Sequence, residues 1–309
     1  MNGAVKAIER SRSRVAVKLS DYAELMKPEL TGLSVLTSLC AFYLASSGAF
    51  NYWLFFHLAL GTTLLGGGAG ALNQYIEREY DALMKRTERR PLPAGRLEPV
   101  QCLTFGIMIS TLGIVELSIF VNLLTGFLAA VTFAIYIFLY TPLKRITPYS
   151  TLVGAIPGAL PPVMGWTAVR NNITMEAAVL FAILFCWQMP HFLSLAWMYR
   201  RDYARAGFKI LTVGDPDGRR TSRQILAYCI GLVPVSLAPS FAGMTGPASI
   251  AGAALLSLGF LTIGILLARQ LHHSDLGHSG DFTSYSRRLF FASLIYLPCL
   301  MLLMTVDKT

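Results

Sequence analysis

Three oxygen-bearing side chains recur at intervals of four residues, directly after a long apolar segment. They are Asn73, Glu77 and Asp81, at the start of the stretch NQYIEREYDALMKRTERRPLP. Residues four apart on a helix lie on the same face, so an amide oxygen and two carboxylates converge. Mg²⁺ characteristically takes one or two carboxylates and completes its coordination with phosphate oxygens. The spacing therefore predicts that Glu77 and Asp81 bind a metal ion, with Asn73 beside them.

Basic residues follow this acidic face at once. Lys85, Arg86 and Arg90 are cations suited to a diphosphate, and Arg fits it through two parallel hydrogen bonds. An ordinary basic loop beside a membrane would explain these charges. It would not explain carboxylates on one helix face beneath an apolar span, where ionisable groups are costly and functional by default. The combination favours a metal–diphosphate site.

The rest of the chain is far too apolar for a soluble domain. Of its 309 residues 54% are hydrophobic and 14% are charged, whereas soluble domains carry about 25% charged residues. Continuous apolar runs reach the roughly 20 residues that cross a bilayer as a helix. These runs predict an all-α polytopic bundle of nine transmembrane helices, at 31–49, 52–72, 100–119, 122–140, 150–168, 174–197, 224–243, 247–268 and 288–305.

The distribution of bases orients these spans. With the N-terminus in the cytoplasm, 24 of the 26 Lys and Arg residues fall on the cytoplasmic side, as expected of inner loops. The net charge of +9 is thus an orientation charge and implies no nucleic acid partner. We expect a basic cytoplasmic tail at 1–28, one membrane domain at 29–309, and a cytoplasmic active site in the long charged loops 73–99 and 198–223.

The second long loop contains YRRDYARAG. Asp202 could bind a second metal ion, or it could pair with Arg200 or Lys144, which we count among the diphosphate cations. Tyr203 could donate a hydrogen bond to a diphosphate, or it could be an aromatic anchor at the membrane interface. Both readings stay open for each residue.

Histidines and glycines add further expectations. His191 lies inside a span beside Pro190, and an intramembrane His is either a polar packing partner or a site residue. His57 is expected to be structural. The group His272, His273 and His278 could ligate a metal, although a solvated loop is the simpler reading. The run GGGAG, from Gly66 to Gly70, predicts close packing of helices.

The pattern N-x-x-x-E-x-x-x-D-x-x-M-x-R-T-x-x-R-P-L, from Asn73 to Leu92, resembles the first aspartate-rich motif of the UbiA superfamily of intramembrane prenyltransferases. The segments MKRTERRPLPAGR, YTPLKRITPYSTLVGAIPGALPPVMGW and WQMPHFLSLAWMYRRDYARAGFKIL are similar to its protoheme IX farnesyltransferase branch. The resemblance covers nearly all of the chain after residue 20. It departs from aromatic-acid relatives at Ala206, where a second D-x-x-x-D motif would place an aspartate.

The resemblance implies transfer of the farnesyl group of farnesyl diphosphate to a vinyl group of protoheme IX, with water addition, giving heme O. It also implies Mg²⁺ as cofactor, a bacterial inner membrane, and a heme A synthase acting downstream. Asn73, Glu77, Asp81, Asp202 and Tyr203 are then the catalytic residues. If heme is the acceptor, an imidazole is an obvious axial ligand, so His191 becomes a heme-binding candidate.

Two alternatives differ in class. Another UbiA-type enzyme would use an aromatic or chlorophyll-type tetrapyrrole acceptor, and the missing second motif together with MKRTERRP argues against it. A transporter or channel would place ionisable residues near the middle of several spans. Apart from His191 and Glu116, the predicted spans lack them.

Overall fold

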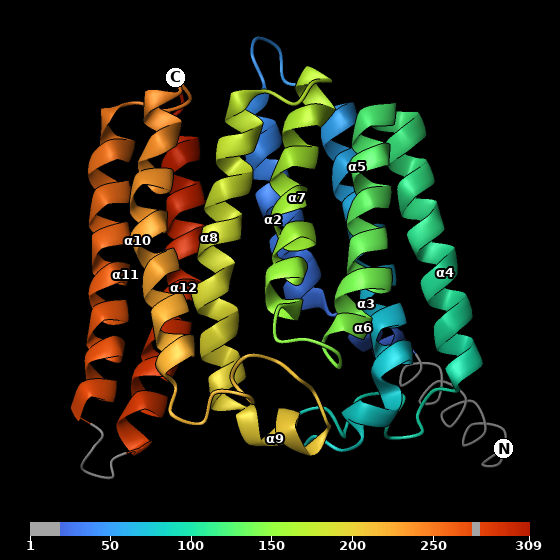
Figure 1. Cartoon of the computed structure of the whole chain (residues 1–309). Coiled ribbons are helices and arrows are strands. Elements are labelled where there is room, and N and C mark those ends of the chain that lie inside the picture. Colours follow the sequence, from blue (N-terminus) through green and yellow to red (C-terminus); the bar gives the residue numbers. More distant parts are fainter. Residues whose placement is uncertain (1–18, 274–278) are drawn as a thin grey trace, which may run out of the picture.

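The computed structural model describes the backbone of residues 19–273 and 279–309, and the side chains of residues 19–270 and 282–309. The described chain is a bundle of helices with roughly aligned axes and no β-strand (Figure 1). Its helices are α2 (Pro28–Ala45), α3 (Tyr52–Asp81), α4 (Pro99–Glu116), α5 (Leu123–Ala134), α6 (Thr141–Leu143), α7 (Ser150–Arg170), α8 (Met175–Met198), α9 (Arg200–Arg205), α10 (Arg219–Phe241), α11 (Pro247–His273) and α12 (Ser279–Val306), with π-helical segments η1 (Leu117–Val121) and η2 (Ile135–Tyr140).

The predicted spans are confirmed. Within the described residues nine helical segments are long and apolar enough to cross a membrane. One difference concerns the second span, which was expected at 52–72 but continues as the 30-residue helix α3 to Asp81. The apolar pattern stops at residue 72 because the helix leaves its apolar surroundings there, while its backbone hydrogen bonding continues. Asn73, Glu77 and Asp81 therefore lie on the same unbroken helix, as their spacing requires.

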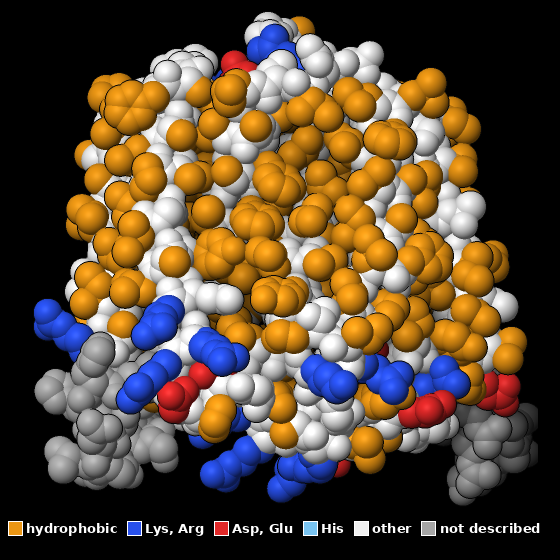
Figure 2. Space-filling view, viewed as in Figure 1, with side chains coloured by type: hydrophobic (Ala, Val, Ile, Leu, Met, Phe, Trp, Pro, Cys, Tyr) orange, Lys and Arg blue, Asp and Glu red, His pale blue; other side chains and the backbone are white. Residues whose placement is uncertain are grey.

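Charged side chains gather at one end of the bundle, which we call the charged end (Figure 2). The longer connections 82–98, 144–149 and 206–218 lie there, and the short helix α9 runs across it (Figure 1). Between the two ends, the visible side is covered by hydrophobic side chains. This band of apolar surface and the one-sided distribution of bases are what a helical membrane protein requires.

Close helix contacts hold the first half of the bundle together. Helix α3 packs against α4, and α2 packs against α3 and α7. Gly68 lies so near α4 that a Cβ atom there would be 2.6 Å from the backbone nitrogen of Ser110. Interfaces of membrane helices use such small residues because they let backbones approach each other. The packing expected of the GGGAG run is thus confirmed.

The π-helical segment η2 precedes the site described below. π-Helical turns are rare and occur frequently at functional sites, because the extra residue shifts the side chains that follow. Here η2 ends at Tyr140 and leads directly into Thr141 and Lys144, which both contact α3.

At the other end of the bundle, His57 Nδ1 lies 2.5 Å from Glu116 Oε1, joining α3 to α4 as a structural histidine would.

Candidate active site

The three residues singled out by their spacing lie together, buried, at the charged end of α3. The exposed fractions of Asn73, Glu77 and Asp81 are 1%, 6% and 0%. Burying two carboxylates is costly unless opposite charges or hydrogen bonds compensate. Their environment should therefore contain cations, and it does.

Each of the three is bound by a basic side chain from a different part of the chain. Lys27 Nζ donates to Asn73 Oδ1 at 2.6 Å, and Lys144 Nζ donates to Glu77 Oε1 at 2.7 Å. Arg90 forms an ion pair with Asp81, which is described below. The sequence prediction included Lys144 and Arg90 but missed Lys27. The signal that could have found it is a basic residue placed directly before Pro28, where the first span begins.

The two lysines experience opposite electrostatic environments. Burial works against the charge on Lys144, but the carboxylate of Glu77, with Tyr140 and Tyr136, outweighs burial and raises the pKa of Lys144. Burial lowers the pKa of Lys27 from 10.5 to about 7, and the neighbouring charges of Arg90 and Lys144 act in the same direction. The carboxylates of Glu77 and Asp81 raise the pKa of Lys27 but do not outweigh burial, and its hydrogen-bond partner is a neutral amide. The site consequently has more positive charge close by than its own acids need.

The acidic face also fits a hard cation. Asp81 Oδ1 is buried and has no hydrogen-bond partner among the described residues. A buried carboxylate oxygen without a partner is costly and calls for an explanation, and binding of a cation would provide one. With Glu77 and the Asn73 amide oxygen, it supplies the oxygen ligands that Mg²⁺ prefers.

Asp202 does not join these ligands in this structure. Its Oδ1 accepts from Arg205 Nη2 at 2.9 Å, within helix α9. Among the described residues, no group of three or more His, Cys, Asp and Glu side chains is arranged to hold one metal ion. The expected partners Arg200 and Lys144 are engaged elsewhere, since the guanidinium of Arg200 lies 4.0 Å from the ring of Trp197.

Tyr203 connects the two charged loops. Its hydroxyl accepts a hydrogen bond from Arg86 Nη2 at 3.1 Å. The Arg86 guanidinium also lies 5.2 Å from the ring of Tyr199, within cation–π range. The structure thus brings Tyr203 and Arg86 together. Lys85, in the same loop, is exposed.

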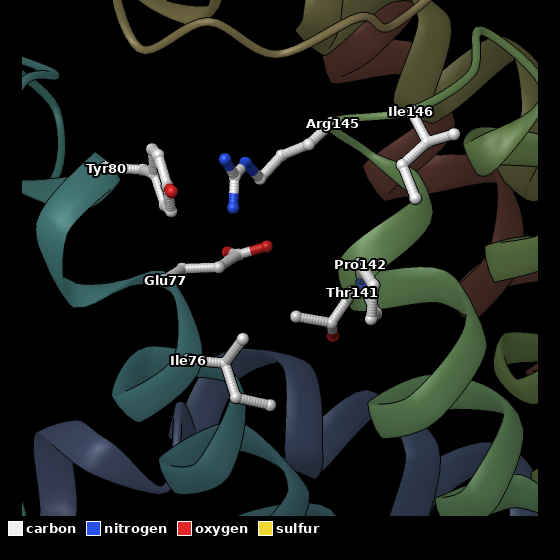
Figure 3. A pocket seen from close by; sticks show the side chains of 7 residues that line it. All are labelled: Ile76, Glu77, Tyr80, Thr141, Pro142, Arg145 and Ile146. Atoms are coloured by element: carbon white, nitrogen blue, oxygen red, sulfur yellow. The ribbon is translucent and has the colours of Figure 1, made fainter.

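A pocket of about 330 Å³ opens beside Glu77. Its walls come from the end of α3 and from the segment 141–146 (Figure 3). Arg145 and Glu77 reach into this space from opposite walls, and the Arg145 guanidinium lies 4.1 Å from the ring of Tyr80. The sequence prediction missed Arg145, although it stands directly beside Lys144. An anion that enters the pocket meets a cation held in place by an aromatic ring.

His191 lies apart from the charged residues, in the apolar interior. Its Nδ1 is 2.7 Å from Ser293 Oγ of α12, and its ring stacks between those of Trp187 and Phe290. Only 7% of the residue is exposed. Helix α8 continues through Pro190, and the partner of His191 is a side chain rather than a carbonyl released by the proline. The imidazole is therefore held in a fixed orientation between two helices.

Solved structures share this architecture. One, described as digeranylgeranylglyceryl phosphate synthase in membranes, superimposes with a TM-score of 0.76 over 94% of this chain and 98% of that one, at 15% sequence identity. A UbiA homologue from Archaeoglobus fulgidus bound to DMAPP and Mg²⁺ gives a TM-score of 0.62 over 90% of this chain and 99% of that one, at 14% identity. These similarities establish the fold.

Sequence comparisons establish the family. A protein named protoheme IX farnesyltransferase from Solibacter usitatus is 46% identical, covering 94% of this chain and 99% of the relative. One of the same name from Koribacter versatilis is 41% identical over the full length of both chains. The profile of the UbiA prenyltransferase family matches residues 34–303. The chain belongs to the UbiA prenyltransferase family.

Proposed function

We propose that this membrane enzyme transfers the farnesyl group of farnesyl diphosphate to a vinyl group of protoheme IX, giving heme O and diphosphate. One observation carries the proposal: an acidic face of buried oxygen ligands surrounded by cations, at the charged end of an otherwise apolar bundle. The full-length similarity to proteins named protoheme IX farnesyltransferase supports heme as the acceptor. Farnesyl and porphyrin are both apolar, and the diphosphate requires the charged end.

The cations stabilise the departing diphosphate. Ionisation of an allylic diphosphate places negative charge on its oxygens, and positioned cations lower the energy of that change. Lys144, Arg90 and Lys27 already converge on α3 from three segments. Arg86 and Tyr203 add a guanidinium and a hydroxyl from the two loops. In this role they act as donors to the diphosphate oxygens.

Mg²⁺ is the cofactor in this proposal. Glu77, Asp81 and Asn73 would hold it, and a second ion at Asp202 stays a prediction. A bound Mg²⁺ supplies positive charge next to the diphosphate oxygens. Lys144 and Arg90 are paired with these carboxylates in the present structure, and their pairing keeps the acidic face compact until ligands arrive.

The interior of the bundle protects the reactive carbon. An allylic cation must be kept from water until its acceptor attacks, and a closed apolar site does this. A vinyl carbon of protoheme IX attacks C1 of the farnesyl group, and water then adds to leave a hydroxyethylfarnesyl side chain. In this proposal His191, whose Nδ1 lies 2.7 Å from Ser293 Oγ, orients or ligates the heme.

We further propose that the charged end faces the cytoplasm of a bacterial inner membrane, since Lys and Arg collect on that side. Residues 29–309 then form one prenyltransferase domain. Within the basic tail proposed for residues 1–28, residues 19–27 pack on the bundle. Residues 1–18 lie outside the described residues. The group His272, His273 and His278 likewise lies outside the described side chains. A heme A synthase is the proposed downstream enzyme.

The test is direct. Purified protein in detergent is incubated with heme b, farnesyl diphosphate and Mg²⁺. The porphyrins are then separated, and their masses are measured by mass spectrometry. A product heavier by one farnesyl group and one hydroxyl group supports the proposal. An aromatic acid and another tetrapyrrole are offered as acceptors in parallel. If heme stays unchanged and one of these is prenylated, the enzyme uses the alternative class of acceptor.

A further inference from the structure

Arg96, at the end of the first charged loop, holds the segment that precedes the first span. Its Nη2 donates to Glu24 Oε2 at 2.6 Å, and its Nη1 donates to Asp21 Oδ1. Nη2 also donates to the carbonyl of Arg89 at 2.8 Å, within the loop itself. One guanidinium thus joins two acids of residues 19–27 to the loop that contains Arg90. The hydrogen bond to Glu24 raises the pKa of Arg96 despite partial burial, so the charge is secure.

The contact is costly to lose because Asp21 is buried. Its exposed fraction is 1%, and its Oδ2 has no hydrogen-bond partner among the described residues, so Arg96 is bound by Oδ1 alone. Removing one member of a buried ion pair leaves an uncompensated charge, which is strongly unfavourable. Without Arg96, the segment would have to move to return Asp21 to water. Arg96 therefore contributes to keeping residues 19–27 docked.

The backbone after Glu24 is fixed against α3. Gln74 Nε2 donates to the carbonyls of Leu25 and Glu24, at 3.1 and 3.3 Å. Leu25 is fully buried. A Cβ atom on Gly70 would lie 3.1 Å from the Leu25 carbonyl oxygen, so the glycine permits this approach. The same Cβ atom would lie 3.4 Å from the Met26 carbonyl oxygen and 3.5 Å from Lys27 Cγ, so the close contact with α3 continues to Lys27.

Lys27 itself has an unusual backbone. Its φ of 49° and ψ of 65° place it in the left-handed region, which costs a residue other than glycine about 1 kcal/mol or more. Pro28 follows and begins α2. A strained residue persists only when its surroundings determine it. Here the docked segment on one side and α2 on the other direct its side chain to Asn73.

We propose that Arg96 is a positioning residue: by docking residues 19–27 it sets the ammonium of Lys27 at the diphosphate site. This inference rests on the proposed function, in which Lys27 binds the diphosphate of farnesyl diphosphate. Arg96 itself acts only through Lys27. If Arg96 had only a structural role, its substitution would lower stability and the amount of active enzyme. It would not selectively affect the binding of one substrate.

The experiment is a double-mutant cycle on the full-length enzyme in detergent, using Lys27→Ala, Arg96→Gln and the double variant. The Michaelis constants for farnesyl diphosphate and for heme are measured separately, with thermal unfolding recorded beside them. We expect each single change to raise the constant for farnesyl diphosphate about tenfold and the double variant to be no worse, because groups that act through one another are not additive. The constant for heme stays unchanged.

Three comparisons separate the outcomes. Arg219→Gln removes the exposed pair with Asp217, in which 64% of the Arg219 side chain is accessible, and should change neither constant. Arg96→Gln combined with Arg86→Ala should be additive. If Arg96→Gln folds poorly, Asp21→Asn with Arg96→Gln removes the buried carboxylate charge together with its partner. This double variant should regain stability while its affinity for farnesyl diphosphate stays low.

Additive effects of Lys27→Ala and Arg96→Gln would overturn the inference. It would also be overturned if Asp21→Asn with Arg96→Gln recovered affinity for farnesyl diphosphate together with stability. An unaltered Michaelis constant in Lys27→Ala would also overturn it, by removing Lys27 from the diphosphate site. Farnesylation of heme would continue in all these cases, so the proposed function would stand. Loss of the proposed function would appear separately, as a wild-type enzyme that leaves heme unmodified.

Discussion

Arg90 Nη1 donates to Asp81 Oδ2 at 2.7 Å, while the other oxygen of the same carboxylate is buried without a partner among the described residues. The two residues are nine positions apart, one at the end of a helix and one in the loop that follows. Asp81 thus has one oxygen compensated by protein and one left for a ligand. This arrangement makes it the most informative position at which to test the site.

Asp81→Asn should nearly abolish turnover while the protein stays folded, because the amide keeps the shape and loses the charge. Removing a charged ligand of a metal–diphosphate complex should slow the reaction on the order of a hundredfold or more. Turnover is measured against Mg²⁺ concentration, with the exposed Asp217→Asn as control. Near-normal activity with an undiminished need for Mg²⁺ would remove Asp81 from the metal site.

Arg86→Ala and Arg90→Ala should each weaken binding of farnesyl diphosphate more than binding of heme. Lys at either position should recover only part of the loss, because an ammonium cannot replace a planar guanidinium that binds two oxygens at once. Equilibrium binding of each substrate checks this. A collapse of heme affinity with intact diphosphate affinity would assign these residues to the heme carboxylates instead.

His191→Ala should alter the Soret band of bound heme and raise the Michaelis constant for heme, with farnesyl diphosphate binding unaffected. Ser293→Ala is the matched variant, since it removes the partner of Nδ1 and keeps the imidazole. It should give a smaller change of the same kind. An unchanged spectrum and unchanged heme affinity in His191→Ala would leave the residue a structural role only.

Affinity for farnesyl diphosphate should fall as pH rises from 7 to 9. The pKa of Lys27 is lowered from 10.5 to about 7, so its charged fraction falls from about one half at pH 7 to about one hundredth at pH 9. An anion binds the charged amine and restores its proton, and affinity therefore follows that fraction. Binding titrations across this range check the slope. Lys27→Ala should flatten it, and an equal slope in that variant would assign the effect to another group.

Gly68→Ala should destabilise the bundle, whereas Gly32→Ala should not. The added methyl on Gly68 would meet the backbone of Ser110, which cannot move without shifting α4. Overpacking of this kind costs about 1–3 kcal/mol. At Gly32 no described atom lies within 4 Å of the added Cβ. Thermal unfolding in detergent distinguishes the two, and similar midpoints for both variants would contradict the packing argument.

Local sequence signals were sufficient for the helices and for the acidic face. Continuous apolar runs predict membrane helices, and the spacing of Asn73, Glu77 and Asp81 is a property of one helix. Residues that reach the site from other segments were harder to predict. Lys144 and Arg90 were predicted as site residues from their charge and from the resemblance. The position of Lys27 was not predicted, because it depends on Arg96, which is 69 residues away in the sequence.

The charged residues of the second loop show the same limit. Charge and motif position made Asp202 a candidate metal ligand and Arg200 a candidate diphosphate cation, and in the structure both contact residues close to them in the sequence. Asp202 binds Arg205 in its own short helix, and Arg200 lies over Trp197. No periodicity distinguishes a cation that faces a ligand from one that faces an aromatic ring. The choice depends on tertiary packing, which the sequence pattern does not contain.

The length of α3 links the enzyme to the lipid around it. Thirty residues of helix extend about 45 Å, against a hydrocarbon thickness of about 30 Å. The acidic ligands are part of that rigid rod, so their height above the acyl chains is set by tilt and by bilayer thickness. Hydrophobic mismatch in a thicker membrane would draw the rim of the site toward hydrocarbon. Lipid acyl-chain length is therefore a physical variable of this active site.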